Sequence, residues 1–165
     1  MEYQLQNHEF PPVWNKNSKI LILGSFPSVK SRQEGFFYGH PRNRFWRVLA
    51  SVLQCEQPET IKQKKKMLLT YGIALWDVIA SCEIKGSSDS SIRNVKANDF
   101  STILSASRIQ AVFTNGQMAG KLYHKYVQKM TGLPAITLPS TSPANAAWSL
   151  ERLIERYRTS LTEFL

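Results

Sequence analysis

Short apolar runs alternate along the chain with longer stretches whose apolar residues recur every three or four positions. Four runs have the length and continuity of strands buried on both faces, and they cover residues 20–23, 73–76, 109–114 and 135–138. Because strand and helix alternate, the sequence predicts an α/β fold with three α/β/α layers around a central four-stranded parallel sheet. In such folds, ligands bind beyond the carboxyl ends of the strands.

Residues that favour helix ends bound most of the helical stretches. Asn43 can cap a helix with apolar positions at Phe45, Trp46, Leu49 and Leu53. A second helix is expected from Glu59 to Leu69, and a short third helix after Asn98 or Asp99, either of which could cap it. A fourth helix is expected from Gly116 to about Met130. The last helix is expected to begin at Ser142-Pro143 and to carry an apolar stripe as far as Leu161.

The first 17 residues differ from the rest of the chain. They are polar and aromatic, and Pro11-Pro12 would break a helix, so we expect an extended lead-in. With 165 residues and no internal repeat, we expect residues 1–165 to form a single domain. The N-terminus lacks the pattern of a signal peptide, and no apolar run is long enough to cross a bilayer.

Charge and cysteine content narrow the class of function. The formal net charge is +9 and the sequence pI is about 9.7, which favours a polyanionic partner such as nucleic acid. Part of the excess is a lysine run at 62–66 that is typical of a solvated helix face. The two cysteines, Cys55 and Cys82, suggest neither disulfides nor a zinc site, so we expect a cytoplasmic protein, nucleoid-associated in a bacterium, without metal or cofactor.

The loop after the first strand carries the densest candidate chemistry. Gly24 would let a ligand approach the backbone, and the amides around Ser25 and Phe26 could contact a carbonyl oxygen. The aromatics at 36–38 can stack on a base, and the arginines at 42 and 44 can meet phosphates. The loop is no nucleotide-binding P-loop, because the Gly-Lys-Ser/Thr ending is missing.

The loop after the fourth strand carries three successive hydroxyls, at Ser140, Thr141 and Ser142. At the start of a helix such hydroxyls suit a phosphate, which would also meet the free amides and the positive end of the helix dipole. Capping of that helix by Ser142 is the simpler interpretation, and the two are compatible.

Several residues allow both a structural and a functional interpretation. Phe45 and Trp46 are expected in the core, and for Phe37 a core position is the alternative to stacking on a base. His40 could donate to a leaving base or hold its loop. Asp77 could orient water, but a structural role is favoured, and Asp89 in the Ser-rich loop 86–91 receives no role.

Taken together, the two loops resemble the uracil-DNA glycosylase superfamily. Gly24-Ser25-Phe26-Pro27 is similar to its first motif, and the run from Tyr38 to Trp46 matches an aromatic followed by His-Pro-x-Asn-Arg-Phe-Trp of the mismatch-specific uracil branch. Tyr71-Gly72-Ile73 matches the next strand entry, and Leu138-Pro139-Ser140-Thr141-Ser142 falls where that branch has Leu-Pro-Asn-Pro-Ser. The resemblance spans residues 21–145.

Three departures from these motifs make the chain most similar to the hypoxanthine (deoxyinosine) glycosylases within the superfamily. Phe26 replaces the Asn or Asp that positions the attacking water, and Ser140 replaces the His or Asn of the second motif. Ala144 or Asn145 replaces the leucine wedge. In the hypoxanthine-type family, this set of losses goes with a catalytic role at the position of Asn43.

The resemblance therefore implies an enzyme that flips a deaminated base out of DNA and hydrolyses its N-glycosidic bond. It assigns catalysis to Asn43, and no metal and no cofactor are expected; DNA is the partner, and we expect a monomer. The base-binding residues it implies are Ser25, Phe26, Tyr38, His40 and Ser140, and the phosphate-binding residues are Ser28, Arg42, Ser142 and Asn145.

Three alternatives remain open at this stage. The preferred base could be uracil in a mismatch or single strand, or xanthine, rather than hypoxanthine. Because Phe26 cannot hydrogen-bond, the chain could also be a lesion-binding module with weak catalysis. A parallel-sheet nucleotide hydrolase is disfavoured, since no phosphate-and-magnesium motif is present.

Overall fold

The computed structural model describes residues 2–165, and at its centre is the predicted four-stranded parallel sheet. Its strands are β2 (Ile20–Gly24), β3 (Ile73–Asp77), β6 (Ala111–Asn115) and β7 (Ala135–Leu138). Their order in the sheet is β3-β2-β6-β7, and each neighbouring pair is parallel. The fold-class prediction is confirmed, and the apolar runs mark the strands because helices cover both faces of the sheet.

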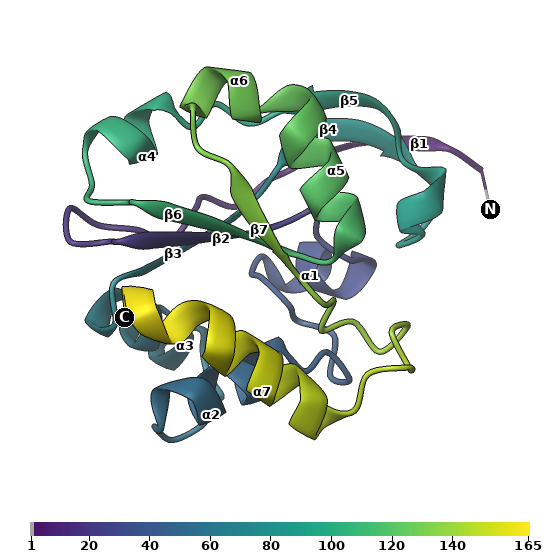
Figure 1. Ribbon diagram of the computed structural model, residues 1–165. Coiled ribbons are helices and arrows are strands. Elements are labelled where there is room, and N and C mark those ends of the chain that lie inside the picture. The colour runs from purple at the N-terminus through teal and green to yellow at the C-terminus, as the bar shows by residue number, and fades with distance from the viewer. Residues whose placement is uncertain (1) are drawn as a thin grey trace.

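Helices form the two outer layers (Figure 1). One face of the sheet is covered by α2 (Phe45–Leu53), α3 (Ile61–Thr70) and α7 (Leu150–Leu161). The other face is covered by α4 (Ser101–Ser105), α5 (Gln117–Tyr126) and α6 (Gln128–Thr131). Each layer buries its own hydrophobic cluster against the sheet. None of these helices, within residues 2–165, is long and apolar enough to cross a membrane.

A second sheet, which the sequence pattern did not predict, packs on the face covered by α4 to α6. It is antiparallel, in the order β1-β4-β5, and consists of β1 (Gln4–Asn7), β4 (Ile79–Ile84) and β5 (Arg93–Ala97). The lead-in is therefore extended as expected, but residues 4–7 pair with β4. These strands mix polar and apolar residues because the sheet is only partly buried, so they lack the continuous apolar run that marks a fully buried strand.

Two helix predictions need correction. No helix begins at Ser142-Pro143; the chain stays irregular until α7, whose N-cap is Ser149. The reason is that Ser140 and Ser142 accept the amides of Ser142 and Ala144, two residues on, and so form local turns. The helix predicted from 116 to 130 is interrupted at Val127 between α5 and α6.

The short elements lie in the connections. Helix α1 (Val29–Glu34) divides the long loop after β2 and is capped by Ser28. Two 3₁₀ turns, η1 (Asp89–Ser91) and η2 (Thr162–Phe164), lie in the β4–β5 connection and after α7. The site described next is built from the connections that follow β2, β4 and β7 and from the last residues of β3 and β6.

Candidate active site

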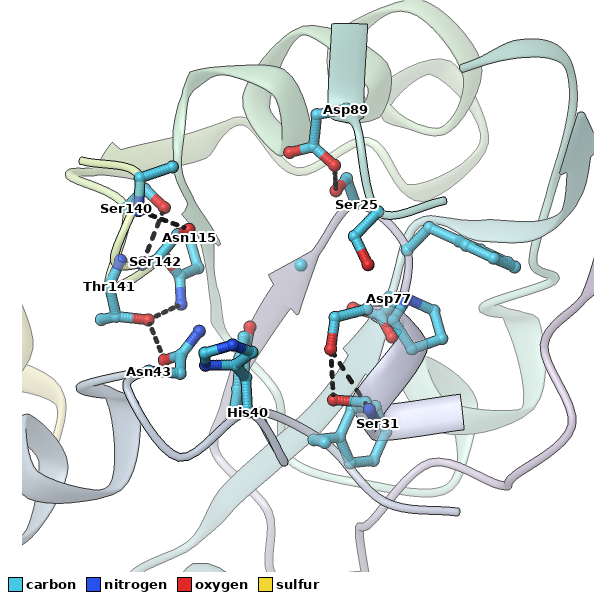
Figure 2. A pocket seen from close by; sticks show the side chains of 18 of the residues that line it. Ser25, Ser31, His40, Asn43, Asp77, Asp89, Asn115, Ser140, Thr141 and Ser142 are labelled. Atoms are coloured by element: carbon cyan, nitrogen blue, oxygen red, sulfur yellow. Dashed lines mark hydrogen bonds between the residues drawn. The ribbon is translucent and has the colours of Figure 1, made fainter. Parts of the chain in front are cut away.

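A pocket of about 470 Å³ opens at the carboxyl ends of the parallel strands (Figure 2). Its walls come from four places in the chain: residues 24–28, residues 37–43, the Ser-rich loop 87–90 and the loop 140–144. The strand ends at Asp77 and Asn115 complete it. The pocket therefore brings together both loops singled out in the sequence, as expected for a parallel sheet.

Gly24 forms the floor of the pocket between Asp77 and Tyr38. A β-carbon at Gly24 would clash with Asp77 Oδ1 and lie 3.0 Å from the Tyr38 hydroxyl, so no larger residue fits between them. Tyr38 itself has a φ of 53°, a left-handed conformation that is uncommon for a bulky residue and concentrates at functional sites. Its ring stacks on Phe45, with ring centroids 4.2 Å apart.

Asp77 pairs with His8, a residue the sequence analysis missed. His8 Nε2 lies 2.7 Å from Asp77 Oδ2, and both side chains are almost fully buried. This contact supports the structural interpretation of Asp77. Burial, together with the nearby Asp77 carboxylate, raises the pKa of Tyr38 well above its usual value, so Tyr38 stays a neutral phenol at physiological pH.

Asn43 lies at the pocket wall where α2 begins. Its Oδ1 accepts the backbone amide of Phe45, the first residue of α2, at 2.9 Å, but the N-cap position itself is Arg44, so the predicted cap lies one residue too early. The same oxygen accepts the hydroxyl of Thr141 at 2.8 Å. Thr141 is fully buried and is held in turn by Asn115, which donates to its hydroxyl at 3.0 Å and accepts its backbone amide at 3.0 Å.

The Ser-rich loop lies across the pocket from this group (Figure 2). Ser25 Oγ donates to Asp89 Oδ1 at 3.3 Å, and the Val29 amide donates to Ser87 Oγ at 2.8 Å. Partial burial in the pocket wall raises the pKa of Asp89, and the Ser25 bond opposes this rise. Asp89 thus has a structural partner that the sequence did not reveal.

Most predicted site residues line the pocket, but their roles stay predictions. Phe26 is buried in its wall, and His40 is exposed at its rim, where His40 Nδ1 accepts the Arg42 amide at 3.1 Å. Arg42 and Asn145 do not line the pocket: the Arg42 side chain is exposed, and Asn145 lines the adjacent groove. The predicted residues that do line it are Ser25, Phe26, Ser28, Tyr38, His40, Asn43, Ser140 and Ser142.

Arg44 has a different position from the one expected of a phosphate contact. Its guanidinium donates to the backbone carbonyls of Ser142 at 2.9 Å, Asn145 at 3.1 Å and Thr141 at 3.4 Å, and also to that of Trp148. The suggestion that Arg44 meets phosphates is therefore wrong for this conformation, because its donors are used inside the protein. Instead it joins the start of α2 to the loop before α7.

Asn115 and His8 are residues of this site that sequence reasoning missed, and Thr141 was noted only as a hydroxyl that suits a phosphate. Asn115 follows directly on an apolar strand, so its position at a strand exit was an available signal. Thr141 stands between two serines that were selected, and His8 had no local signal at all. Within residues 2–165, no group of three or more His, Cys, Asp or Glu side chains is arranged to hold a metal ion.

Comparison with known proteins places this geometry in a family. A family model described as the uracil DNA glycosylase superfamily matches residues 11–162. A hypoxanthine DNA glycosylase of Methanosarcina acetivorans is 36% identical over 145 residues, covering 87% of this chain and 90% of the relative. One of Methanosarcina barkeri is 33% identical over 144 residues, covering 86% and 89%.

The fold has a similar solved counterpart. The solution NMR structure of a candidate uracil DNA glycosylase from Methanosarcina acetivorans matches with a TM-score of 0.78 and 32% sequence identity. The match covers 94% of this chain and 98% of that one. Sequence and fold therefore agree over nearly the whole length of both proteins.

Proposed function

Because the chain belongs to the uracil DNA glycosylase superfamily, we propose that it excises hypoxanthine from DNA by hydrolysing the N-glycosidic bond. One observation carries the proposal. The amide of Asn43 stands in the pocket wall, while Phe26 is buried in the same wall, at the motif position that the resemblance assigns to a water-positioning Asn or Asp in the uracil branches. The two relatives named hypoxanthine DNA glycosylases support the choice of base.

The reaction needs little from the protein besides positioning and charge stabilisation. The bond from the sugar C1′ to the base nitrogen breaks, and its electron pair leaves with the base. A water molecule adds to C1′ and loses a proton, and the base takes up a proton from solvent. An oxocarbenium-like sugar reacts with neutral water, so hydrogen-bond donors toward the departing base contribute more than a strong general base.

The pocket suits a flipped purine by shape. The aromatic side chains of Phe26 and Tyr38 line it, and either ring could stack on the base. Phe26 replaces a polar side chain, so selection among bases would depend more on stacking and size than on hydrogen bonding. Flipping costs a few kcal/mol, and least for a base that is already mispaired, so excision should increase from a stable pair to a mismatch.

The remaining expectations are part of the same proposal. The basic charge supports binding of the DNA phosphates, with Ser28, Arg42, Ser142 and Asn145 as contacts. We propose that the protein acts as a monomer without metal in the compartment that holds DNA. Excision in excess EDTA at the rate without EDTA would support the metal-free part.

A panel of lesion duplexes tests the function. Single-turnover release of base from hypoxanthine, uracil and xanthine duplexes is followed by alkaline cleavage of the abasic strand. We expect hypoxanthine to be released fastest, and Asn43→Ala to lower the rate by about 100-fold or more with DNA affinity nearly unchanged. Uracil released at least as fast in every context would assign the chain to mismatch-uracil repair, and tight binding without product would make it a lesion-binding module.

A further inference from the structure

Two backbone amides determine which way the side-chain amides of Asn43 and Asn115 face. A backbone N–H can only donate, so the Asn43 atom 2.9 Å from the Phe45 nitrogen must be the oxygen. By the same reasoning, the Asn115 atom 3.0 Å from the Thr141 nitrogen is its oxygen. The orientation of both amides therefore follows from the backbone and not from a choice between similar atoms.

The hydroxyl of Thr141 then has one possible role. Asn115 presents its NH₂ group at 3.0 Å, so Thr141 accepts from it. Asn43 presents its oxygen at 2.8 Å, so Thr141 gives it its single proton. The hydrogen bonds run in one direction, from Asn115 through Thr141 to Asn43.

These hydrogen bonds occupy the side-chain oxygen of Asn43. Its Oδ1 takes two hydrogen bonds, one for each lone pair, from Phe45 and Thr141. Its Nδ2 donates to no protein acceptor within residues 2–165, and Figure 2 shows it turned away from Thr141 toward the middle of the pocket. What Asn43 offers a substrate is thus a donor.

Polarisation strengthens this donor. Bonds in a chain polarise one another, and two donors on the oxygen of an amide withdraw electrons from its nitrogen. Thr141 is fully buried, so water does not compete for its hydroxyl. Holding a group in one orientation in this way is the pre-organisation that makes electrostatic stabilisation effective.

We propose that Thr141 and Asn115 are positioning residues that keep the NH₂ group of Asn43 facing the substrate. Asn43 then donates a hydrogen bond to the departing base and does not accept a proton from the attacking water. This inference rests on the glycosylase function proposed above and specifies its mechanism. It also gives a purpose to Thr141, which the second motif contains without a stated role, and to Asn115, which lies outside both motifs.

Substitution of the Thr141 hydroxyl provides the first test. Thr141→Val keeps the shape and removes the hydroxyl, so we expect the single-turnover rate on a hypoxanthine duplex to fall by about 10- to 100-fold. Thr141→Ser restores the hydroxyl and should stay within about threefold of the unmodified protein, since the same hydrogen bond can form. Affinity for abasic DNA should not change.

Thr114→Val is the matched control. Thr114 is also fully buried, precedes Asn115 on β6 and bonds to Thr137, outside the pocket. We expect a rate close to that of the unmodified protein. Equal losses in Thr114→Val and Thr141→Val, or an unchanged rate in Thr141→Val, would overturn the positioning role.

Asn115→Asp tests the direction of the hydrogen bonds. An aspartate can accept the Thr141 amide as Asn115 does, but its second oxygen would take the Thr141 proton away from Asn43. The rate should therefore fall about as far as in Thr141→Val. A rate like that of the unmodified protein would contradict the proposed direction, even if Thr141→Val failed to fold.

Asn43→Asp separates donor from acceptor. A carboxylate has no proton to donate and would repel the electron-rich base, so we expect a loss as large as that in Asn43→Ala. If Asn43 instead held the water by accepting its proton, Asn43→Asp would keep or exceed the rate of the unmodified protein, and the donor role would be wrong. An unmodified protein that releases no base from any duplex would overturn the proposed function itself, and the inference with it.

Discussion

The hydroxyls of Ser140 and Ser142 each accept one backbone amide of their own loop, from Ser142 at 3.1 Å and Ala144 at 3.2 Å. Like Asn43, they have acceptor atoms engaged within the protein and protons still to donate. A pocket that offers donors suits both an electron-rich leaving base and the phosphates beside it.

Ser140→Ala and Ser142→Ala test whether the hydroxyls of this loop bind phosphate, or whether Ser140 contacts the base, the role that the resemblance implies for it. Each should weaken binding by about tenfold, roughly 1.4 kcal/mol, which is the size of one hydrogen bond to a charged group. Because phosphates carry no sequence information, we expect the same loss for hypoxanthine, uracil and undamaged duplexes in fluorescence anisotropy at fixed salt.

The control for these variants is Ser105→Ala on α4, whose hydroxyl donates to a carbonyl of its own helix. It should bind like the unmodified protein. A loss confined to one lesion would place these hydroxyls against the base instead of the backbone.

At the scale of elements, the loop between β7 and α7 has no helix or strand of its own and depends on Arg44. Four carbonyls from Thr141 to Trp148 accept bonds from this one guanidinium. Asn145 adds a bond from its side chain to the Ser140 carbonyl at 2.9 Å. The loop that presents Thr141 to Asn43 is therefore held by the residue that follows Asn43 in sequence.

Arg44→Lys should loosen this loop. A lysine ammonium has no planar fork and cannot reach four carbonyls together, so we expect a loss of about 1–3 kcal/mol in the free energy of unfolding. The excision rate should fall by about 10-fold or more as Thr141 loses its position. Urea unfolding and single-turnover kinetics measure the two effects.

Arg47→Lys, one turn further along α2 and exposed, is the matched control and should change neither quantity. Stability and rate both unchanged in Arg44→Lys would show that the loop holds its shape without the guanidinium.

At the scale of the whole molecule, burial gives the fold a specific sensitivity to alkaline pH. Burial raises the pKa of the Cys82 thiol to about 11 and also raises the pKa of Tyr157. Between pH 9 and 11 the unfolded chain loses the thiol proton while the folded chain keeps it, so rising pH favours unfolding. The stabilising contribution is complete below pH 9 and is lost toward pH 11.

We therefore expect the denaturant midpoint of the unmodified protein to fall steadily from pH 8.5 to 10.5. In Cys82→Ala the midpoint should fall less over the same pH range, even if the variant is also less stable at pH 8. Cys55→Ala is the comparison, because Cys55 is only half-buried. Equal slopes for Cys82→Ala and the unmodified protein would exclude this thiol as the cause.

The sequence by itself determined the central sheet, most of the helices and two of the loops that form the pocket. These features are local: a strand buried on both faces must be an apolar run, and Asn43 could be selected from a contiguous motif. Phe45 and Trp46 were expected in the core for the same reason, and they are buried, as is Phe37, for which a core position was one of two alternatives. The antiparallel sheet escaped prediction because its half-exposed strands lack such a run.

Only the tertiary structure decided how the side chains of the site are used. His8 meets Asp77 across 69 residues of chain, and Thr141 meets Asn43 across 98, so no local pattern carries either contact. Arg44 was expected at phosphates, but a guanidinium donates to whichever acceptors the fold brings near, and here these are the carbonyls of a distant loop. Residue types follow from sequence, whereas the direction of a hydrogen bond depends on the partner that folding supplies.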